Sequence, residues 1–227
     1  MKDAFEKGLF WELYVDLERQ FLAYLDYVPY LKGNERTYSF KLLNLALSIG
    51  GYIDSFFKEM VRYGEFTDED CIEKCNEIKE LMSAGKSIDI YMPINAFEKE
   101  YSFSKTKVVF KCLPQRKGMT PFALRPNGNN IPTWWSFYND LKHDLSVNLK
   151  KANLKNTRDA LAGAFILNAV HKPSIFRLHK YGLLKMRYGV LLNDNQLKDQ
   201  LTNNQTPPGL IETNLFIYDY EENPKFK

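Results

Sequence analysis

Apolar residues recur at spacings of three and four in the N-terminal third of the chain, which is the pattern of amphipathic helices. One helix is predicted from 10 to 28 and a second from 39 to about 62. The middle of the second, residues 42–49, is apolar nearly all round, so we expect it to be the most buried helix. A third helix is predicted after the capping sequence at 67–70 and should stop before Gly85.

Two adjacent glycines, Gly50 and Gly51, interrupt the second predicted helix. Each costs roughly 1 kcal/mol of helix propensity relative to alanine. We therefore expect either a close contact with a neighbouring helix or a kink at this point.

The periodicity changes between residues 87 and 131. Short β-like runs at 88–92, 107–112 and 121–124 alternate with Asn, Pro and Gly residues that are typical of turns. This segment is predicted to form an inserted hairpin or small sheet rather than a second domain.

Helical spacing returns in two segments, 132–151 and 156–171, and small residues in the second would allow a neighbour to approach closely. The tail beyond them is mixed. Residues 175–192 are compatible with a helix or with strands, and 215–220 is predicted to be a strand that joins the inserted sheet.

These elements predict a mainly α protein, an up-and-down helical bundle with a small β insertion. We expect a single domain over 1–227. Its parts are helices within 5–84 and 132–171, a β-containing insertion at about 87–131 and a mixed tail over 174–227.

The helix predicted from 132 to 151 has two distinct faces. At 100° per residue from Leu141, a core stripe lies within about 80°, and its members are Trp134, Phe137, Tyr138, Leu145 and Leu149. A second group lies about 120° to 200° away, and it consists of Trp135, Asn139, His143 and Ser146. Asn139 and His143 are four residues apart and can converge on one group. Trp135 should pack on the insertion, the tail or a second subunit, although a solvated surface remains the plain alternative for His143.

Charge is distributed unevenly although the net charge is only +3. Residues 101–187 contain sixteen Lys and Arg against three acids, a net +13, which leaves −10 for the rest. This asymmetry favours a polyanionic partner, unless the two parts neutralise each other within the fold. The basic stretch 172–187 leaves the same choice between a binding surface and an ordinary solvated one.

The sequence also limits the chemistry. The longest apolar stretch, 160–170, is too short for a membrane span, and the acidic, amphipathic residues 1–20 do not resemble a secretory signal, so we expect a cytoplasmic protein away from membranes. The three cysteines are expected to be reduced and structural, although Cys71 and Cys75 lie on adjacent turns of one helix. With neither a phosphate loop nor a metal-ligand cluster, we expect no cofactor and no metal.

The segment WWSFYNDLKHD at 134–144, followed by the small-residue helix that starts at Asn156, resembles the third and fourth helices of the HEPN superfamily (higher eukaryotes and prokaryotes nucleotide-binding). The helix over 39–60 is similar to the second helix of that family. The resemblance covers about 60% of the chain and leaves out the 87–131 insertion and the tail.

This resemblance implies a helical bundle, usually a homodimer, and in many members metal-independent RNA cleavage of the toxin or phage-defence type. The motif of that family is Arg, commonly Asn, then His. Asn139 and His143 stand in matching places, but Tyr138 stands where the Arg is expected.

Metal-free RNA cleavage needs a group that takes the proton from a 2′-hydroxyl and a cation that stabilises the charge on the phosphate. His143 is the candidate acid or base, since an imidazole titrates near neutral pH, and Asn139 is its polar partner. Tyr138 carries no charge, so cleavage should be weak or lost. The candidate substrate-binding residues are Lys142, Trp135, Lys150, Lys151 and Arg158.

Two functions therefore follow from the sequence. The first is an RNA-directed HEPN-like protein, active or vestigial as an endoribonuclease. The second is a non-catalytic homodimeric interaction or ligand-binding module on the same scaffold. The partners that fit these functions are a second copy of the chain, RNA, and an antitoxin-like or other protein.

Overall fold

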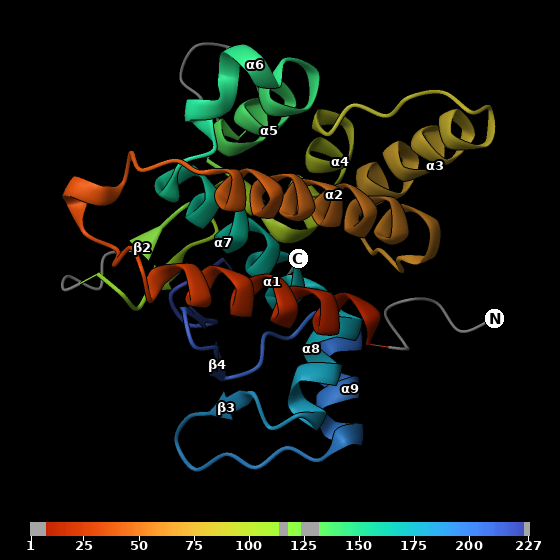
Figure 1. The fold of residues 1–227 in the computed structure, drawn as a ribbon. Coiled ribbons are helices and arrows are strands. Elements are labelled where there is room, and N and C mark those ends of the chain that lie inside the picture. Colours follow the sequence, from red (N-terminus) through yellow and green to blue (C-terminus); the bar gives the residue numbers. More distant parts are fainter. Residues whose placement is uncertain (1–7, 114–117, 124–131, 225–227) are drawn as a thin grey trace.

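The protein is mainly helical in this computed structural model, which describes residues 8–113, 118–123 and 132–224. Two long helices, α1 (Leu9–Leu25) and α2 (Phe40–Tyr63), pack on each other, and α7 (Leu154–Val170) packs against both (Figure 1). The helices predicted over 10–28 and 39–62 are confirmed, although the first ends a few residues early. None of the helices in the described ranges is long and apolar enough to cross a membrane.

The most buried helix is α7, so the prediction that assigned this position to α2 was wrong. Fourteen of the 17 residues of α7 are buried, against 12 of the 24 in α2. The small residues predicted to allow close approach explain the difference, because they let neighbours reach α7 from several sides. An ideal Cβ on Gly163 would lie 3.3 Å from the ring of Trp134, which shows how closely α5 lies on α7.

The segment between α2 and the sheet contains a helix that the sequence did not predict. Helix α3 (Glu69–Ser83) was expected, and Asp68 caps it by accepting a hydrogen bond from the Cys71 amide at 3.0 Å. The β-like run at 88–92, however, leads into helix α4 (Tyr91–Tyr101), which packs on α3. Residues 88–90 of that run precede the helix and form no strand, and only Tyr91 and Met92 belong to α4. The buried residues Ile94, Phe97 and Tyr101 follow helical spacing.

A small sheet joins the insertion to the tail. Its five described strands are antiparallel in the order β2-β1-β5-β4-β3, and their bounds are β1 (Val108–Phe110), β2 (Gly118–Met119), β3 (Leu184–Met186), β4 (Gly209–Glu212) and β5 (Phe216–Asp219). Pairing of Phe110 with Phe216 confirms that the strand predicted at 215–220 joins the inserted sheet. The predicted run at 121–124 is not a strand in its described part, because Pro121 and Phe122 form a turn; Leu124 lies outside the described residues.

The helix predicted from 132 to 151 is broken at Asp144. Helix α5 (Thr133–His143) ends there, and α6 (Leu145–Asn148) and the 3-10 turn η3 (Leu149–Lys151) follow. Asp144 is extended, with φ −146° and ψ 79°, and its carboxylate accepts a hydrogen bond from the Val147 amide. The break turns Leu145 outward to 41% exposure, contrary to its predicted place in the core stripe.

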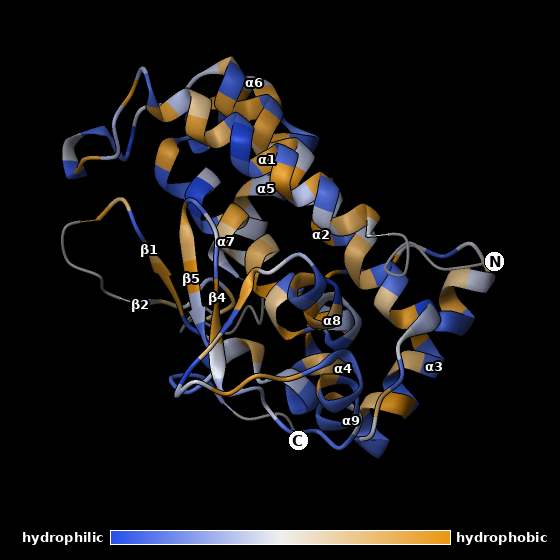
Figure 2. Ribbon diagram, turned by 90° about the horizontal axis from the view of Figure 1, so that it is seen from below, coloured by the Kyte–Doolittle hydropathy of each residue, from blue (hydrophilic) through white to orange (hydrophobic). Residues whose placement is uncertain are grey.

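The tail beyond α7 contains both kinds of structure that the sequence left open for 175–192. Helix α8 (Lys172–Lys180) is followed by β3, and helix α9 (Asp194–Thr202) precedes β4. Buried Glu18 of α1 holds this tail to the bundle, because its carboxylate accepts hydrogen bonds from the Leu215 amide at 3.2 Å and from the hydroxyl of Thr213. Figure 2 shows hydrophobic residues on strands β1, β4 and β5, which pack with the helices into one large core cluster.

Candidate functional site

Helix α5 carries the predicted catalytic residues, and two tryptophans position it. The indole of Trp134 donates a hydrogen bond to the Pro121 carbonyl at 2.9 Å and lies on Gly163 of α7. Trp135 is 6% exposed, with its ring centroid 4.7 Å from that of Tyr138. Trp135 is therefore buried within the chain, and its ring contacts are with Trp134 and Tyr138 of its own helix, where the sequence predicted the insertion, the tail or a second subunit.

Tyr138, at the position where the HEPN resemblance expects Arg, packs against α2. A Cβ added to Gly50 would lie 2.2 Å from the Tyr138 ring, so the ring occupies the space that a side chain on α2 would fill. Desolvation, with a contribution from Asp54, raises the pKa of Tyr138. Gly50 is thus the close contact that the glycine pair predicted, and the phenol at this position is part of the helix packing.

The two adjacent glycines should respond in opposite directions to the same substitution. Gly50→Ala is expected to lower the free energy of unfolding by about 1–3 kcal/mol, since the ring of Tyr138 must shift. Gly51→Ala, where nothing lies within 4 Å of the added Cβ, should raise it by about 0.5–1 kcal/mol. Urea unfolding of both variants measures the difference, and equal effects would contradict the proposed contact. Adding Tyr138→Ala to Gly50→Ala should recover part of the loss.

Asn139 and His143 lie on the outer side of α5. Asn139 is half-buried and His143 is exposed, and no hydrogen bond or ion pair within the described ranges holds either side chain. The Nζ of Lys142 lies 5.9 Å from the centroid of the Tyr138 ring, where the cation meets the electron-rich face of the phenol. The structure therefore presents an accessible imidazole, with Lys142 on the adjoining side of the same helix.

Arg158, another predicted substrate-binding residue, is buried at 7% exposure. Its guanidinium hydrogen-bonds to Asp159 and to the hydroxyl of Tyr30, lies 3.9 Å from the carboxylate of Glu35, and stacks over the Tyr30 ring at 5.0 Å from the centroid. Burial raises the pKa of Asp159 while Arg158 opposes the rise. The guanidinium of Arg158 is therefore bound to partners inside the protein and is not presented at the surface.

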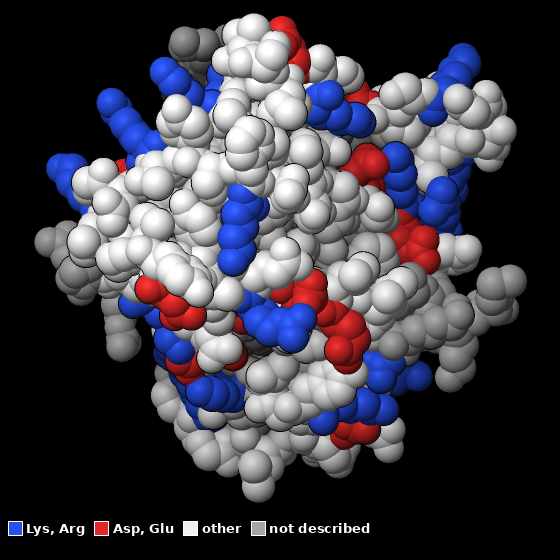
Figure 3. All heavy atoms as spheres, viewed as in Figure 1, with Lys and Arg blue, Asp and Glu red and all other residues white. Residues whose placement is uncertain are grey.

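Lys150 and Lys151 lie in a surface groove, which we call the basic groove. Its volume is about 400 Å³, and it is lined by Glu35, Arg36, Phe137, Lys150, Lys151, Asn153, Lys155 and Asn156. It lies between helix α5 with turn η3 on one side and the segment after η1 (Lys32–Asn34) on the other. In Figure 3 several Lys and Arg side chains project at the upper left, over the end of the molecule where Figure 1 has α6 and the segment that precedes α2.

Hydrogen bonds fix the walls of the basic groove. The amide of Leu154 donates to the Thr37 carbonyl at 2.9 Å, and the amide of Lys155 donates to the Glu35 carbonyl at 3.0 Å. Asn153 caps α7 by accepting from the Asn156 amide at 3.0 Å. The groove is therefore built on backbone that is already hydrogen-bonded, so an anion in it would be held by side chains.

The cations that line the basic groove differ in whether an acidic residue pairs with them. Lys151 pairs with Asp140 at 2.6 Å. Arg36, Lys150 and Lys155 have no acidic partner within 4 Å in the described part of the chain. Sequence reasoning missed Arg36 and Lys155; Arg36 lies far from α5 in sequence, and only the pairing of 35–38 with 153–155 brings it to the groove.

The basic groove and the His143 side occupy different parts of α5. At 100° per residue, His143 is about 120° round the helix from Phe137, and Asp140 lies between them. The imidazole therefore projects from a different side of α5 than Phe137, the residue of this helix that lines the groove. The basic groove brings Lys150 and Lys151 together with Phe137, whereas His143, Trp135 and buried Arg158 do not line it.

Much of the remaining basic block is neutralised by acids from outside it. Lys111 and Lys185 both bind Glu212, at 2.7 Å and 2.5 Å, and hold the pKa of that carboxyl at about 2. Arg187 binds Asp219 and Glu221. Acids from outside the basic block therefore neutralise Lys111, Lys185 and Arg187. Within the described ranges, the basic groove gathers three cations that no ion pair holds.

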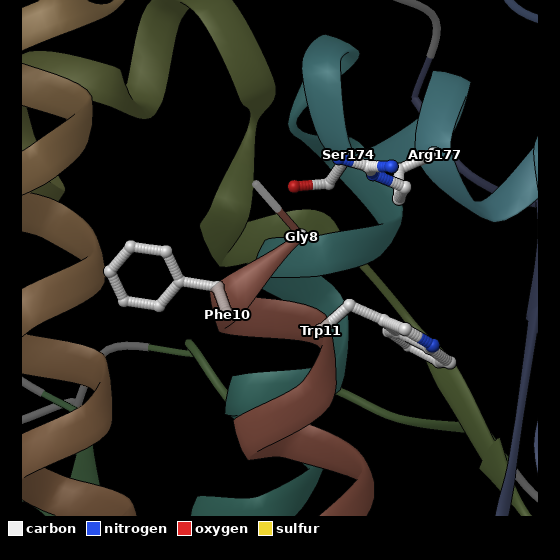
Figure 4. A pocket seen from close by; sticks show the side chains of 5 residues that line it. All are labelled: Gly8, Phe10, Trp11, Ser174 and Arg177. Carbon is white, nitrogen blue, oxygen red and sulfur yellow. The ribbon is translucent and has the colours of Figure 1, made fainter. Parts of the chain in front are cut away.

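Other features of the described residues do not form a ligand site. A cavity between α1 and α8, lined by Gly8, Phe10, Trp11, Ser174 and Arg177, has a volume of about 10 Å³, enough for one water (Figure 4). The thiols of Cys71 and Cys75 are buried, and their mutual hydrogen bond together with burial raises the pKa of Cys71. In the ranges that the structure describes, no three His, Cys, Asp or Glu side chains are grouped to hold a metal.

Comparison with models of protein families, with curated proteins and with solved structures finds no match for this chain.

Proposed function

We propose that the chain is an RNA-directed protein of HEPN-like type, and that the basic groove binds the phosphate backbone of the RNA. The observation that carries this proposal is the convergence of Arg36, Lys150 and Lys155 on one groove, where no acidic residue of the described ranges lies within 4 Å of their charged groups. Cations that hold phosphates release counterions on binding, which supplies affinity without reading sequence.

In this proposal cleavage of the bound RNA is weak or lost. The expected arginine is replaced by Tyr138, and its ring is fixed between Trp135 and Gly50. His143 is accessible, but it is not among the residues that line the basic groove. A transition state at His143 would lack the fixed guanidinium of the family motif, and its charged donor would have to come from exposed Lys142 on the adjoining side of α5 or from a second subunit.

The binding of RNA should depend on the cations of the groove. We expect the paired change Lys150→Gln with Lys155→Gln to lower affinity for a labelled RNA about tenfold and to make the slope of log K against log salt shallower by about 1.4. Fluorescence anisotropy between about 50 and 200 mM salt measures both quantities. The matched control, Lys86→Gln with Lys198→Gln, removes two exposed lysines outside the groove and should change the slope little.

The same RNA, incubated with the protein in EDTA, tests the catalytic part separately. Intact RNA fits the proposal. Cleavage that disappears in a folded His143→Ala variant would show instead an active metal-independent ribonuclease. In the binding experiment, an affinity that neither salt nor the groove variants change would overturn the proposal and leave the non-catalytic interaction module. Equal binding of DNA would make the groove a general polyanion site.

A further inference from the structure

The basic groove contains an aromatic side chain among its cations. Phe137 of α5 is half-buried and lines the groove together with Lys150, Lys155 and Arg36. Aromatic rings next to a positively charged channel are the combination by which proteins hold single-stranded nucleic acid, because every base has a face that can stack. A site for phosphates alone would not need the ring.

The size of the groove limits what can occupy it. A volume of about 400 Å³ is near the lower end for a small-molecule pocket, which suits one organic group rather than a run of bases. In an RNA duplex the bases are stacked inside the helix, and a protein meets mainly phosphates and 2′-hydroxyls. Only an unpaired base can therefore reach the side chain of Phe137 on the wall of the groove.

The anchoring of the groove favours a fixed geometry for such a base. The side-chain amide of Asn156 donates to the Lys151 carbonyl at 2.8 Å, and the side-chain amide of Asn153 donates to the Lys150 carbonyl at 3.2 Å. Both lysines are thus presented from backbone that side-chain hydrogen bonds hold in place. The one carboxylate of the groove, Glu35, accepts a hydrogen bond from Tyr30 at 3.2 Å and lies 3.9 Å from Arg158, which reduces its repulsion of a phosphate.

We propose that the basic groove holds one unpaired nucleotide, with its base against Phe137 and its phosphates on Lys150 and Lys155. This proposal rests on the proposed function. The protein then selects single-stranded over duplex RNA at this groove. The same chemistry would be met by a free mononucleotide, so the ligand class is a nucleotide with an accessible base.

Anisotropy with three RNAs of one sequence tests the role of the ring: a single strand, its duplex, and a single strand with abasic positions. The wild-type protein should bind the single strand about tenfold more tightly than the duplex or the abasic strand. Phe137→Leu should remove that difference and leave duplex binding unchanged. The control Phe40→Leu replaces a 69% exposed aromatic outside the groove lining and should change nothing.

The outcomes separate the two proposals. Equal binding of all three RNAs by the wild-type protein, or a Phe137→Leu variant that weakens the single strand and the duplex alike, would overturn the base-stacking site while RNA binding stands. Absence of any RNA binding would overturn both. Competition by a mononucleotide at concentrations close to those of the RNA would assign the site to free nucleotides. The abasic strand tests the wild-type protein directly, so a misfolded variant does not decide the result.

Discussion

Replacing Glu100 with Ala is expected to lower the free energy of unfolding by about 3 kcal/mol, since it leaves the partly buried Lys172 without its acidic partner. Glu100 of α4 is 1% exposed. Its carboxylate accepts a hydrogen bond from Lys172 of α8 at 3.2 Å and from the amides of Thr67 and Asp68 at 3.3 and 3.1 Å. Loss of this group would leave two backbone donors without their acceptor and Lys172 with Asn204 but no acidic partner.

Chemical denaturation of Glu100→Ala beside Glu77→Ala measures this effect. Glu77 is an exposed acid on α3, and its removal should change stability by less than about 0.5 kcal/mol. The double variant Glu100→Met with Lys172→Met removes both charges and should recover much of the loss. A Glu100→Ala variant as stable as the control would show that the ion pair contributes little to the packing of α3, α4 and α8.

Acidification is expected to destabilise the protein through His171, in the window between pH 6.5 and about pH 3. His171 is buried between α7 and α8, with Nδ1 3.0 Å from the hydroxyl of Ser174 and its ring against Phe56. Desolvation, aided by the charge of Lys172, lowers the pKa of His171 from 6.5 to about 3. The unfolded chain therefore binds a proton in this window while the folded chain does not.

The sign follows from that difference in proton binding. The contribution of neutral His171 to stability is fully present above the pKa of His171 in the unfolded chain. As the pH falls from there towards its pKa in the folded chain, the free energy of unfolding decreases by about 1.4 kcal/mol per pH unit from this one group. Unfolding of wild type and His171→Gln at pH 7 and pH 4.5 isolates the contribution, because the carboxylates titrate alike in both. The wild type should lose more stability than the variant on acidification; parallel losses would mean that His171 is protonated in the fold.

The polar buried contacts behind these two predictions involve the insertion and the tail. Glu100 belongs to the insertion, and Lys172 and His171 lie where the bundle gives way to the tail. Together with the hydrogen bond of buried Glu18 to Leu215, they bind segments that hydrophobic periodicity treats as separate. The sheet order gives the same result, since a strand of the insertion pairs with a strand of the tail.

The amino-acid sequence by itself determined where most of the long helices lie and which side of each is buried. Regular apolar spacing predicts α1, α2 and α3 because such a face has to be buried whatever its neighbour is, and the small residues of α7 predict the close approach of a neighbour. The glycine pair predicted a close contact or a kink at α2, and the structure shows the contact. The sequence also indicated Lys150 and Lys151, although it could not show what they face.

The tertiary structure alone decided the remaining features, because they depend on contacts between residues far apart in the chain. A helix packed on α3 follows where the sequence predicted a strand at 88–92, and capping by Asp144 divided one predicted helix into two. Small residues on α7, rather than the apolar centre of α2, set the most buried position, since they admit neighbours from several sides. The basic groove exists only because the segment at Arg36 hydrogen-bonds to the start of α7, which turns scattered lysines into one electrostatic site.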